Sequence, residues 1–353
     1  MKKNKLSFVI SILMILPVIM FAGNEDRVGE AGAYELLINP FPRSAGWGLA
    51  NMSQVSGFEA IFLNPAGAAF TNKIDVGFAN TQWLKGSGVT INSFGLSTKI
   101  GKQQNSVLAL GLMTMSFGDI MITTPDKPEG GIGYYTPSFL NITASFAHSF
   151  SSSIHVGASV KIISESIADM GATGIAIDAG IQYIPSSNEN IRLGIALRNI
   201  GPALRFSGDG LSFRGNVFGN DVTMTVEHRS ENFELPTQLL ISAGYIFHLQ
   251  ENVENHLLSV GGSFISNAFS RDQFSLGLEY NYKDIFMVRS SYCYEKGITT
   301  TDDRATAYTG PAFGATIQAP LNKDKSSFLA FEYAYRLSDP FSGTHQFGVK
   351  VLF

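Results

Sequence analysis

The chain has 353 residues, of which 44% are hydrophobic and only 15% are charged, whereas ordinary globular domains carry about 25% charged residues. The formal net charge of −4 is too small to indicate binding to nucleic acid or to a strongly anionic surface. The single cysteine, Cys293, excludes an internal disulfide framework and a cysteine-based zinc site.

Residues 1–22 are predicted to be a secretory signal peptide. Lysines head the chain, an apolar run follows at 6–21, and Ala22 and Gly23 supply small residues for cleavage. After Gly23, no apolar run approaches the ~18 residues of a membrane helix. An exported, hydrophobic chain of this kind is expected to be either a soluble β-protein or a β-barrel.

Residues 23–72 fit no strand pattern. Their Ala, Gly, Phe and Leu content favours a plug packed in a barrel lumen, with the periplasm as the alternative location. Helical turns are expected around 45–52 and 56–63, and the second should end before Pro65 because the residue preceding a proline avoids the helical region. Asn64, Pro65 and Gly67 are therefore predicted to shape a turn of this plug, with a direct ligand role as the alternative.

Fourteen segments are predicted to be β-strands, and many alternate at period two. In the segment 325–337, Phe331 and Tyr333 share one face, and Glu332 and Arg336 share the other. The segment 105–117 is apolar on both faces, so its pattern does not determine its register. The segments span residues 73–83, 88–100, 105–117, 135–150, 153–167, 171–184, 190–200, 236–249, 255–267, 271–282, 284–295, 308–319, 325–337 and 342–353.

The connections between these segments alternate in length. Counted from an inside N-terminus, the even-numbered ones are short and polar, whereas several odd-numbered ones, at 118–134, 201–235 and 296–307, are long. Outer-membrane barrels have short periplasmic turns and longer external loops, whereas in a β-sandwich long and short connections are not expected to alternate along the chain. The sequence therefore predicts an all-β fold, a 14-stranded antiparallel transmembrane β-barrel over 73–353, located in the outer membrane.

The chain ends inside a strand pattern, THQFGVKVLF. Phe347, Val349, Val351 and Phe353 share one face. By itself this fits the edge of a soluble sandwich or the last strand of an outer-membrane barrel, whose terminal aromatic faces lipid. In the barrel, Phe353 is expected to serve as an assembly signal.

Five stretches, in this order, resemble the PorV/PorQ family: RSAGWGLANMSQVSGFEAIFLNPAGAAF, RNIGPALRF, LPTQLLISAGYIF, GLEYNYKDIFMVRSSYCYEKG and FEYAYRLSDPFSGTHQFGVKVLF. That family is similar to the FadL-like fourteen-stranded barrels, which also share an Asn-Pro element in their plug. Departures are Glu332, where Asp is commoner, and Gln346, where Arg is usual. They leave open whether the chain is PorV-like, PorQ-like or a paralogue of unassigned role.

The resemblance implies a role in the type IX secretion system of Bacteroidota. PorV-like members accept folded cargo with a C-terminal signal domain from the translocon and pass it to surface-attachment proteins. The implied partners are therefore these proteins, the cargo signal domains and outer-membrane lipid, without nucleic acid. A FadL-like channel for hydrophobic small molecules is the alternative, because architecture alone does not fix function.

No enzymatic site is predicted. The histidines show no ligand spacing, no nucleophile elbow is present, and the His228–Glu227 neighbours lie in a loop. Neither a cofactor nor a metal is expected. Glu332 and Arg336 should face a wet lumen, where charges avoid the ~2–4 kcal/mol cost of the lipid face, and pair there with the plug through Arg43 or stay separately solvated.

The loop 201–235 is the candidate partner-binding element. Its apolar side chains include Phe206, Phe213, Phe218 and Met224, which is unusual for a solvated loop. They are expected either to pack as a hairpin on the barrel rim or to form an exposed partner surface.

Overall fold

The computed structural model describes residues 23–216, 222–249, 256–324 and 326–353. The predicted signal peptide, 1–22, and Phe218 lie outside these residues. Within them, fourteen strands close into one barrel. The barrel strands are β1 (Ile74–Trp83), β2 (Val89–Ile100), β3 (Ser106–Ser116), β6 (Ser138–Ser149), β7 (Ile154–Ile167), β8 (Met170–Tyr183), β9 (Ile191–Ile200), β12 (Gln238–His248), β13 (His256–Asn267), β14 (Gln273–Tyr282), β15 (Phe286–Glu295), β16 (Tyr308–Pro320), β17 (Phe328–Ser338) and β18 (Thr344–Leu352).

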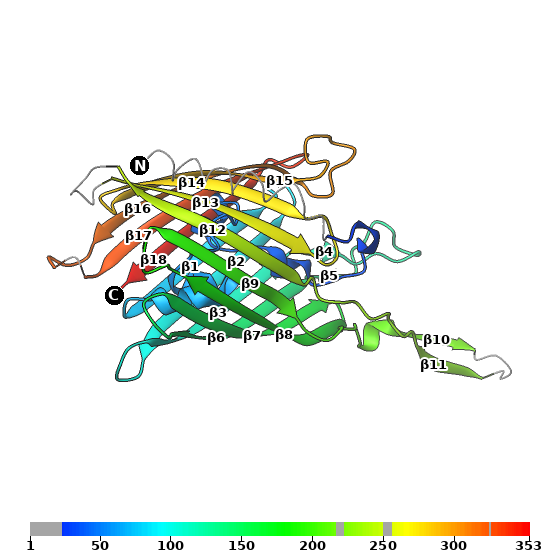
Figure 1. Cartoon of the computed structure of the whole chain (residues 1–353). Helices are drawn as coiled ribbons and strands as arrows, with labels where there is room; N and C mark the ends of the chain where they lie inside the picture. The colour runs from blue at the N-terminus through cyan, green and yellow to red at the C-terminus, as the bar shows by residue number, and fades with distance from the viewer. Residues whose placement is uncertain (1–22, 217–221, 250–255, 325) are drawn as a thin grey trace.

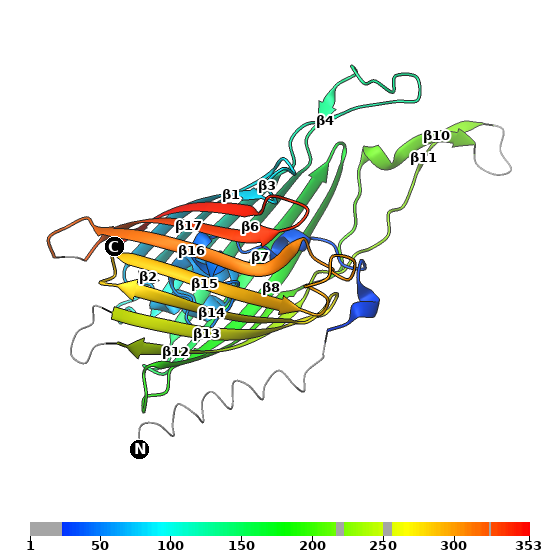
Figure 2. The ribbon, with the colours of Figure 1, turned by 90° about the horizontal axis from the view of Figure 1, so that it is seen from above.

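Each barrel strand pairs with its neighbours along the chain in the antiparallel sense, and β1 pairs with β18 to close the sheet (Figures 1 and 2). In this seam Phe78 lies opposite Val349, and Asn80 lies opposite Phe347. Beyond the last strand, the Phe353 N–H donates to the Ile74 carbonyl oxygen at 2.8 Å. The predicted fourteen-stranded barrel is confirmed.

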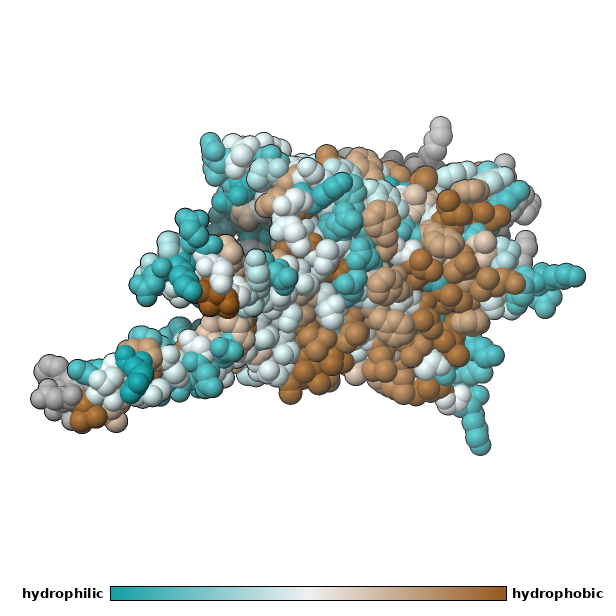
Figure 3. Space-filling view, turned by 180° about the vertical axis from the view of Figure 1, so that it is seen from behind, coloured by the Kyte–Doolittle hydropathy of each residue, from teal (hydrophilic) through white to brown (hydrophobic). Residues whose placement is uncertain are grey.

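The barrel wall is apolar on its outer face. In β3, which the pattern left ambiguous, Leu108, Leu110 and Leu112 face outward, whereas Met113 and Met115 are buried toward the lumen. Figure 3 shows brown side chains gathered over the wall, with hydrophilic residues at the barrel ends and on the projecting hairpin. A closed barrel with an apolar belt is the architecture of outer-membrane proteins, so the predicted localisation is confirmed. Outward apolar residues include Phe78, Phe94, Leu110, Phe146, Ile162, Ile177, Ile195, Leu278, Val288, Phe313, Phe331 and Phe347.

The two barrel ends differ. The connections at one end, such as 101–105 and 283–285, are short, and the C-terminus lies there (Figure 1). At the other end β4 (Ile120–Met121) and β5 (Tyr134–Tyr135) form one hairpin, and η6 (Asp209–Leu211), β10 (Ser212–Asn216) and β11 (Thr223–Glu227) form a longer arm (Figure 2). Because periplasmic turns are short and external loops are long, we assign the hairpin-bearing end as the external end.

The segment ahead of β1 folds into short helices. Those inside the barrel are stacked between strands far apart in sequence (Figure 1). No helix among the described residues is long and apolar enough to span a membrane. The helices are η2 (Glu25–Arg27), η3 (Tyr34–Leu37), α2 (Pro42–Gly46), η4 (Gly57–Phe62) and η5 (Pro65–Phe70).

Candidate functional site

Residues 31–71, here called the plug, fill the lumen. They are almost entirely buried, although they contain little regular helix. Phe41, Phe58 and Ile61 form a hydrophobic core with the inward side chains of β2 and β3, such as Ile91 and Met113. Met52 and Leu63 form a second core with inward residues of β9, β12 and β13. Burial of this apolar surface is what holds the plug against the wall.

A belt of strand glycines lets the plug touch the wall. A Cβ atom built on any of ten described strand glycines would lie 3.0 Å or less from a plug atom, and at eight of them the distance is shorter than real Cβ contacts show. At Gly157 the obstacle is the backbone of Pro65 and Ala66, at 2.4–2.6 Å. The plug backbone and the plug side chains therefore approach the sheet this closely because these strand positions have no side chain. The glycine belt comprises Gly77, Gly95, Gly111, Gly157, Gly180, Gly194, Gly244, Gly261, Gly277 and Gly348.

The predicted Asn-Pro turn lies at the centre of this contact. The Asn64 side chain caps η5 by accepting from the Ala66 N–H at 3.1 Å, and it donates to the Ile181 carbonyl oxygen of β8 at 3.2 Å. The Gln182 amide of β8 donates to the carbonyl oxygens of Met52 and Val55. A Cβ on Gly67 would lie 2.2 Å from that Val55 oxygen. Each of the three predicted turn residues thus serves the packing of the plug.

Arg43 of the plug pairs with Glu279 of β14. Its guanidinium donates to the Glu279 carboxylate at 2.9 Å, and that carboxylate also accepts from the Trp47 indole N–H at 3.2 Å and forms an ion pair with Arg289 at 2.8 Å. Two hydrogen-bond donors and two guanidinium charges on one buried carboxylate favour its ionised form.

Glu332 and Arg336 take different partners. Glu332 lies 2.7 Å from the Lys350 ammonium of β18, which also pairs with the buried Glu59 of the plug. Arg336 lies over the Tyr308 ring, with its guanidinium carbon 3.8 Å from the ring centroid. Glu332 therefore reaches the plug through Lys350 and Glu59. Sequence reasoning did not single out Lys350, Glu279 or Glu59, although each strand residue alternates onto the lumenal face.

A second ionic cluster joins the plug to β7, β8 and β9. The Asp178 carboxylate lies 2.6 Å from the Lys161 ammonium and 3.9 Å from Arg198 Nε, and all three side chains are buried. Arg198 also donates to the Leu36 carbonyl oxygen of the plug at 3.0 Å. A register shift between β8 and β9 turns both Arg198 and Asn199 toward the lumen. The alternation rule misses such a pair because a bulge adds one residue to a single strand.

The long external arm is two-faced. Across the β10–β11 pair, Phe213 lies opposite Val226 and Gly215 lies opposite Met224, so these four residues share one side. Arg214 and the neighbouring threonines lie on the other side. Phe213 and Met224 are 43% and 46% exposed, and the Phe213 ring stacks on His228 at 4.6 Å between centroids.

Phe206 behaves differently from the other loop candidates. It is half-buried at the rim, where its ring lies 5.7 Å from Phe233, and both rings pack on a core that contains Leu36 and Leu204. The base of the loop therefore belongs to the barrel, and the exposed apolar residues belong to the arm beyond it.

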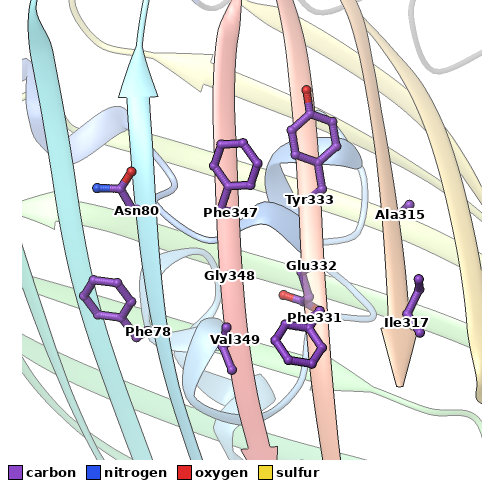
Figure 4. A pocket seen from close by; sticks show the side chains of 10 residues that line it. All are labelled: Phe78, Asn80, Ala315, Ile317, Phe331, Glu332, Tyr333, Phe347, Gly348 and Val349. Atoms are coloured by element: carbon purple, nitrogen blue, oxygen red, sulfur yellow. The ribbon is translucent and has the colours of Figure 1, made fainter. Parts of the chain in front are cut away.

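A groove of about 390 Å³ crosses the outer wall over β1, β18, β17 and β16 (Figure 4). Phe78, Phe331 and Phe347 border it, and Gly348 lies between the aromatic side chains. Because it lies on the lipid-facing side, this groove is separate from the filled lumen.

No family model and no curated protein sequence matches the chain. Among solved structures it is similar to a FadL homologue of Pseudomonas aeruginosa, with a TM-score of 0.51, 12% identity, and coverage of 89% of this chain and 98% of the homologue. It is also similar to the toluene transporter TodX of Pseudomonas putida, with a TM-score of 0.51, 12% identity, and coverage of 84% and 92%. At these identities the similarity concerns the fold, which is a FadL-like barrel.

Proposed function

We propose that this protein is a barrel component of a type IX secretion system that binds translocon or attachment proteins and secreted cargo through its external loops. The two-faced arm is the observation that carries the proposal, because Phe213 and Met224 are exposed well beyond the barrel rim. An isolated two-stranded hairpin is marginally stable in water, so a partner that covers its apolar side would stabilise it. The PorV/PorQ-like stretches support the specific system.

The plug supports a binding role over a conducting one. It is bound to the wall by the glycine belt, by ion pairs of Arg43 and Glu59, and by the hydrogen bond from Arg198 of β9 to the Leu36 carbonyl oxygen. Opening a path through it would require separating these buried charges, and breaking one such pair costs about 3–5 kcal/mol.

A FadL-like channel for hydrophobic small molecules is the second candidate. It is favoured by the similarity in fold to a protein described as a toluene transporter. The two proposals differ in which part of the molecule is needed: the arm for partner binding, or a passage past the plug for transport.

The test removes the arm and leaves its base. Residues 212–227 are replaced by Asn-Gly, a favoured two-residue hairpin turn, because the His228 N–H already donates to the Leu211 carbonyl oxygen at 2.9 Å. Phe206 and Phe233 stay in place. We expect the variant to assemble normally but to lose co-purifying partners from native outer membrane, together with surface delivery of cargo.

A matched pair of variants separates the two faces of the arm. Phe213→Ser with Met224→Thr should reduce partner recovery at least ~10-fold, whereas Arg214→Ser with Thr225→Ser on the opposite face should leave it within ~2-fold. Persistent cargo delivery by the armless variant, with uptake of a hydrophobic solute abolished by plug variants, would replace this proposal with the channel.

A further inference from the structure

The first described residues lie at the external rim. Glu25 pairs with Lys296 at 2.9 Å and lies 3.6 Å from Arg271, both in external connections. The Arg27 guanidinium carbon lies 4.3 Å from the centroid of Phe269, and its nitrogens pair with Glu234 at 2.8 Å. From Gly23 onward, the described chain thus runs from the external loops through the lumen to β1, which starts at the opposite end of the barrel.

Gly23 occupies a closely fitted position in this rim. Its backbone N–H donates to the Asp272 carboxylate at 2.8 Å, and Asp272 is only 8% exposed. A Cβ on residue 23 would lie 2.8 Å from the Asp272 nitrogen, from its Oδ1 atom and from the Ser270 carbonyl oxygen. Only glycine fits here without displacing the loop, and its nitrogen points at a buried carboxylate.

We propose that the mature chain begins at Gly23 and that its new α-ammonium group binds Asp272 as a buried ion pair at the external rim. Hydrolysis of the Ala22–Gly23 peptide bond consumes one water molecule, leaves a carboxylate on Ala22 and frees an amine on Gly23 that takes up a proton. A hydrogen bond from a peptide N–H to a carboxylate thereby becomes an ion pair between an ammonium group and that carboxylate.

The placement gives this pair a structural role. The nitrogen of Gly23 can carry a charge only after cleavage, so the ion pair exists only in the processed chain, whereas the hydrogen bond to Asp272 needs no cleavage. Cleavage at another bond would place a different residue, or additional chain, on Asp272. The ion pair therefore requires a mature chain that begins with glycine, and it would fix the outer end of the segment that continues into the plug.

The first test reads the state of the amine in the wild-type barrel. Purified, detergent-solubilised protein is treated at pH 7 with N-hydroxysuccinimidyl acetate, folded or unfolded in guanidinium, and the N-terminal peptide is quantified by mass spectrometry. An ordinary α-amine titrates near pH 7.7–8.0 and reacts readily. We expect the first residue to be Gly23 and its acetylation to be at least ~10-fold slower in the folded barrel.

Two variants separate the ion pair from simple burial. Asp272→Asn keeps the shape but removes the charge, and it should bring folded and unfolded acetylation rates within ~3-fold of each other. Asp302→Asn, at an exposed carboxylate of the neighbouring loop, should leave the protection intact. A different first residue, equal rates in wild type, or full protection in Asp272→Asn would each overturn the proposal. The wild-type comparison decides it even where a variant does not assemble.

Discussion

Gly157 shows how a single position determines whether the plug can reach the wall. In a strand, glycine normally weakens the sheet because it has no side chain to pack and loses more backbone freedom on folding. Here its inward side is covered by the backbone of Pro65 and Ala66, which carries no rotamer that could move aside. The missing Cβ is therefore a requirement of the contact between plug and wall.

We predict that Gly157→Ala destabilises the assembled barrel by about 1–3 kcal/mol, the usual cost of overpacking a core. Gly262→Ala is the matched control, because a Cβ there would meet its nearest neighbours at 3.6 Å and 3.7 Å, an ordinary van der Waals distance. Unfolding in detergent, followed by tryptophan fluorescence, measures both. Equal stability of the two variants would show that the plug yields readily and that the belt is not needed.

The ionic partners of the plug show where residue-level prediction ends. Alternation correctly places Glu332 on the lumenal face, but it cannot name Lys350 or Glu59 as its neighbours. Arg43 and Glu279 lie 236 positions apart, so their contact depends on how the plug crosses the closed barrel. Period-two patterns specify a face, whereas pairing across a lumen depends on the whole fold.

At the scale of elements, the strands were the most predictable part of the chain. Each of the fourteen predicted segments overlaps one barrel strand, because an outer apolar face alternates with a polar or small inner face in most of them. The β8–β9 bulge was not predictable, since one extra residue changes the alternation locally. In the plug, the turn expected around 56–63 corresponds to η4, whereas the other short helices were not predicted at their positions.

The last strand would also act as an assembly signal if the assembly machinery recognises its terminal residue. We predict that Phe353→Ala lowers the amount of assembled barrel more than Phe331→Ala does. Both side chains are large, outward-facing aromatics, 46% and 56% exposed, so each should contribute a similar burial of about 1.5–3 kcal/mol in lipid. Phe353→Ala keeps the backbone bond to Ile74.

Quantitative recovery of folded barrel from outer membranes measures this difference. A larger loss for Phe353→Ala would indicate recognition of the terminal residue, since lipid burial alone affects both variants alike. Similar recovery of the two variants would reduce Phe353 to an ordinary lipid-facing side chain.

For the whole molecule, plug and barrel share their hydrophobic cores and form one packed unit. The lumenal cores include residues from both, and the plug is bonded to the wall on several sides. The external arm, in contrast, extends beyond that unit and leaves its apolar side uncovered. This separation of a packed barrel from an exposed arm is consistent with the proposed role of the arm in binding other proteins.

The cohesion of this unit should depend on pH through Glu35, a plug residue outside the strands. Burial, and next the nearby Glu165 carboxylate, raises the pKa of Glu35 to about 7, and the Asn141 amide donates to its side chain at 3.3 Å. The folded state therefore holds a proton that the unfolded chain releases near pH 4.5. Stability should fall as the pH rises from 4.5 to about 7, by an amount on the order of 3 kcal/mol.

This prediction is tested on the complete barrel by gel electrophoresis of boiled and unboiled samples, which shows whether the barrel unfolds only on heating. The unboiled protein should migrate differently from the boiled one on a gel, and the temperature of that conversion should fall between pH 5 and pH 8. Glu35→Gln removes the titrating carboxyl group at that position and should flatten the pH dependence of the conversion temperature. Glu129→Gln, in the exposed loop of the β4–β5 hairpin, should retain that pH dependence. Identical migration before and after boiling would contradict a stable barrel, and an unchanged pH dependence in Glu35→Gln would assign the proton to another group.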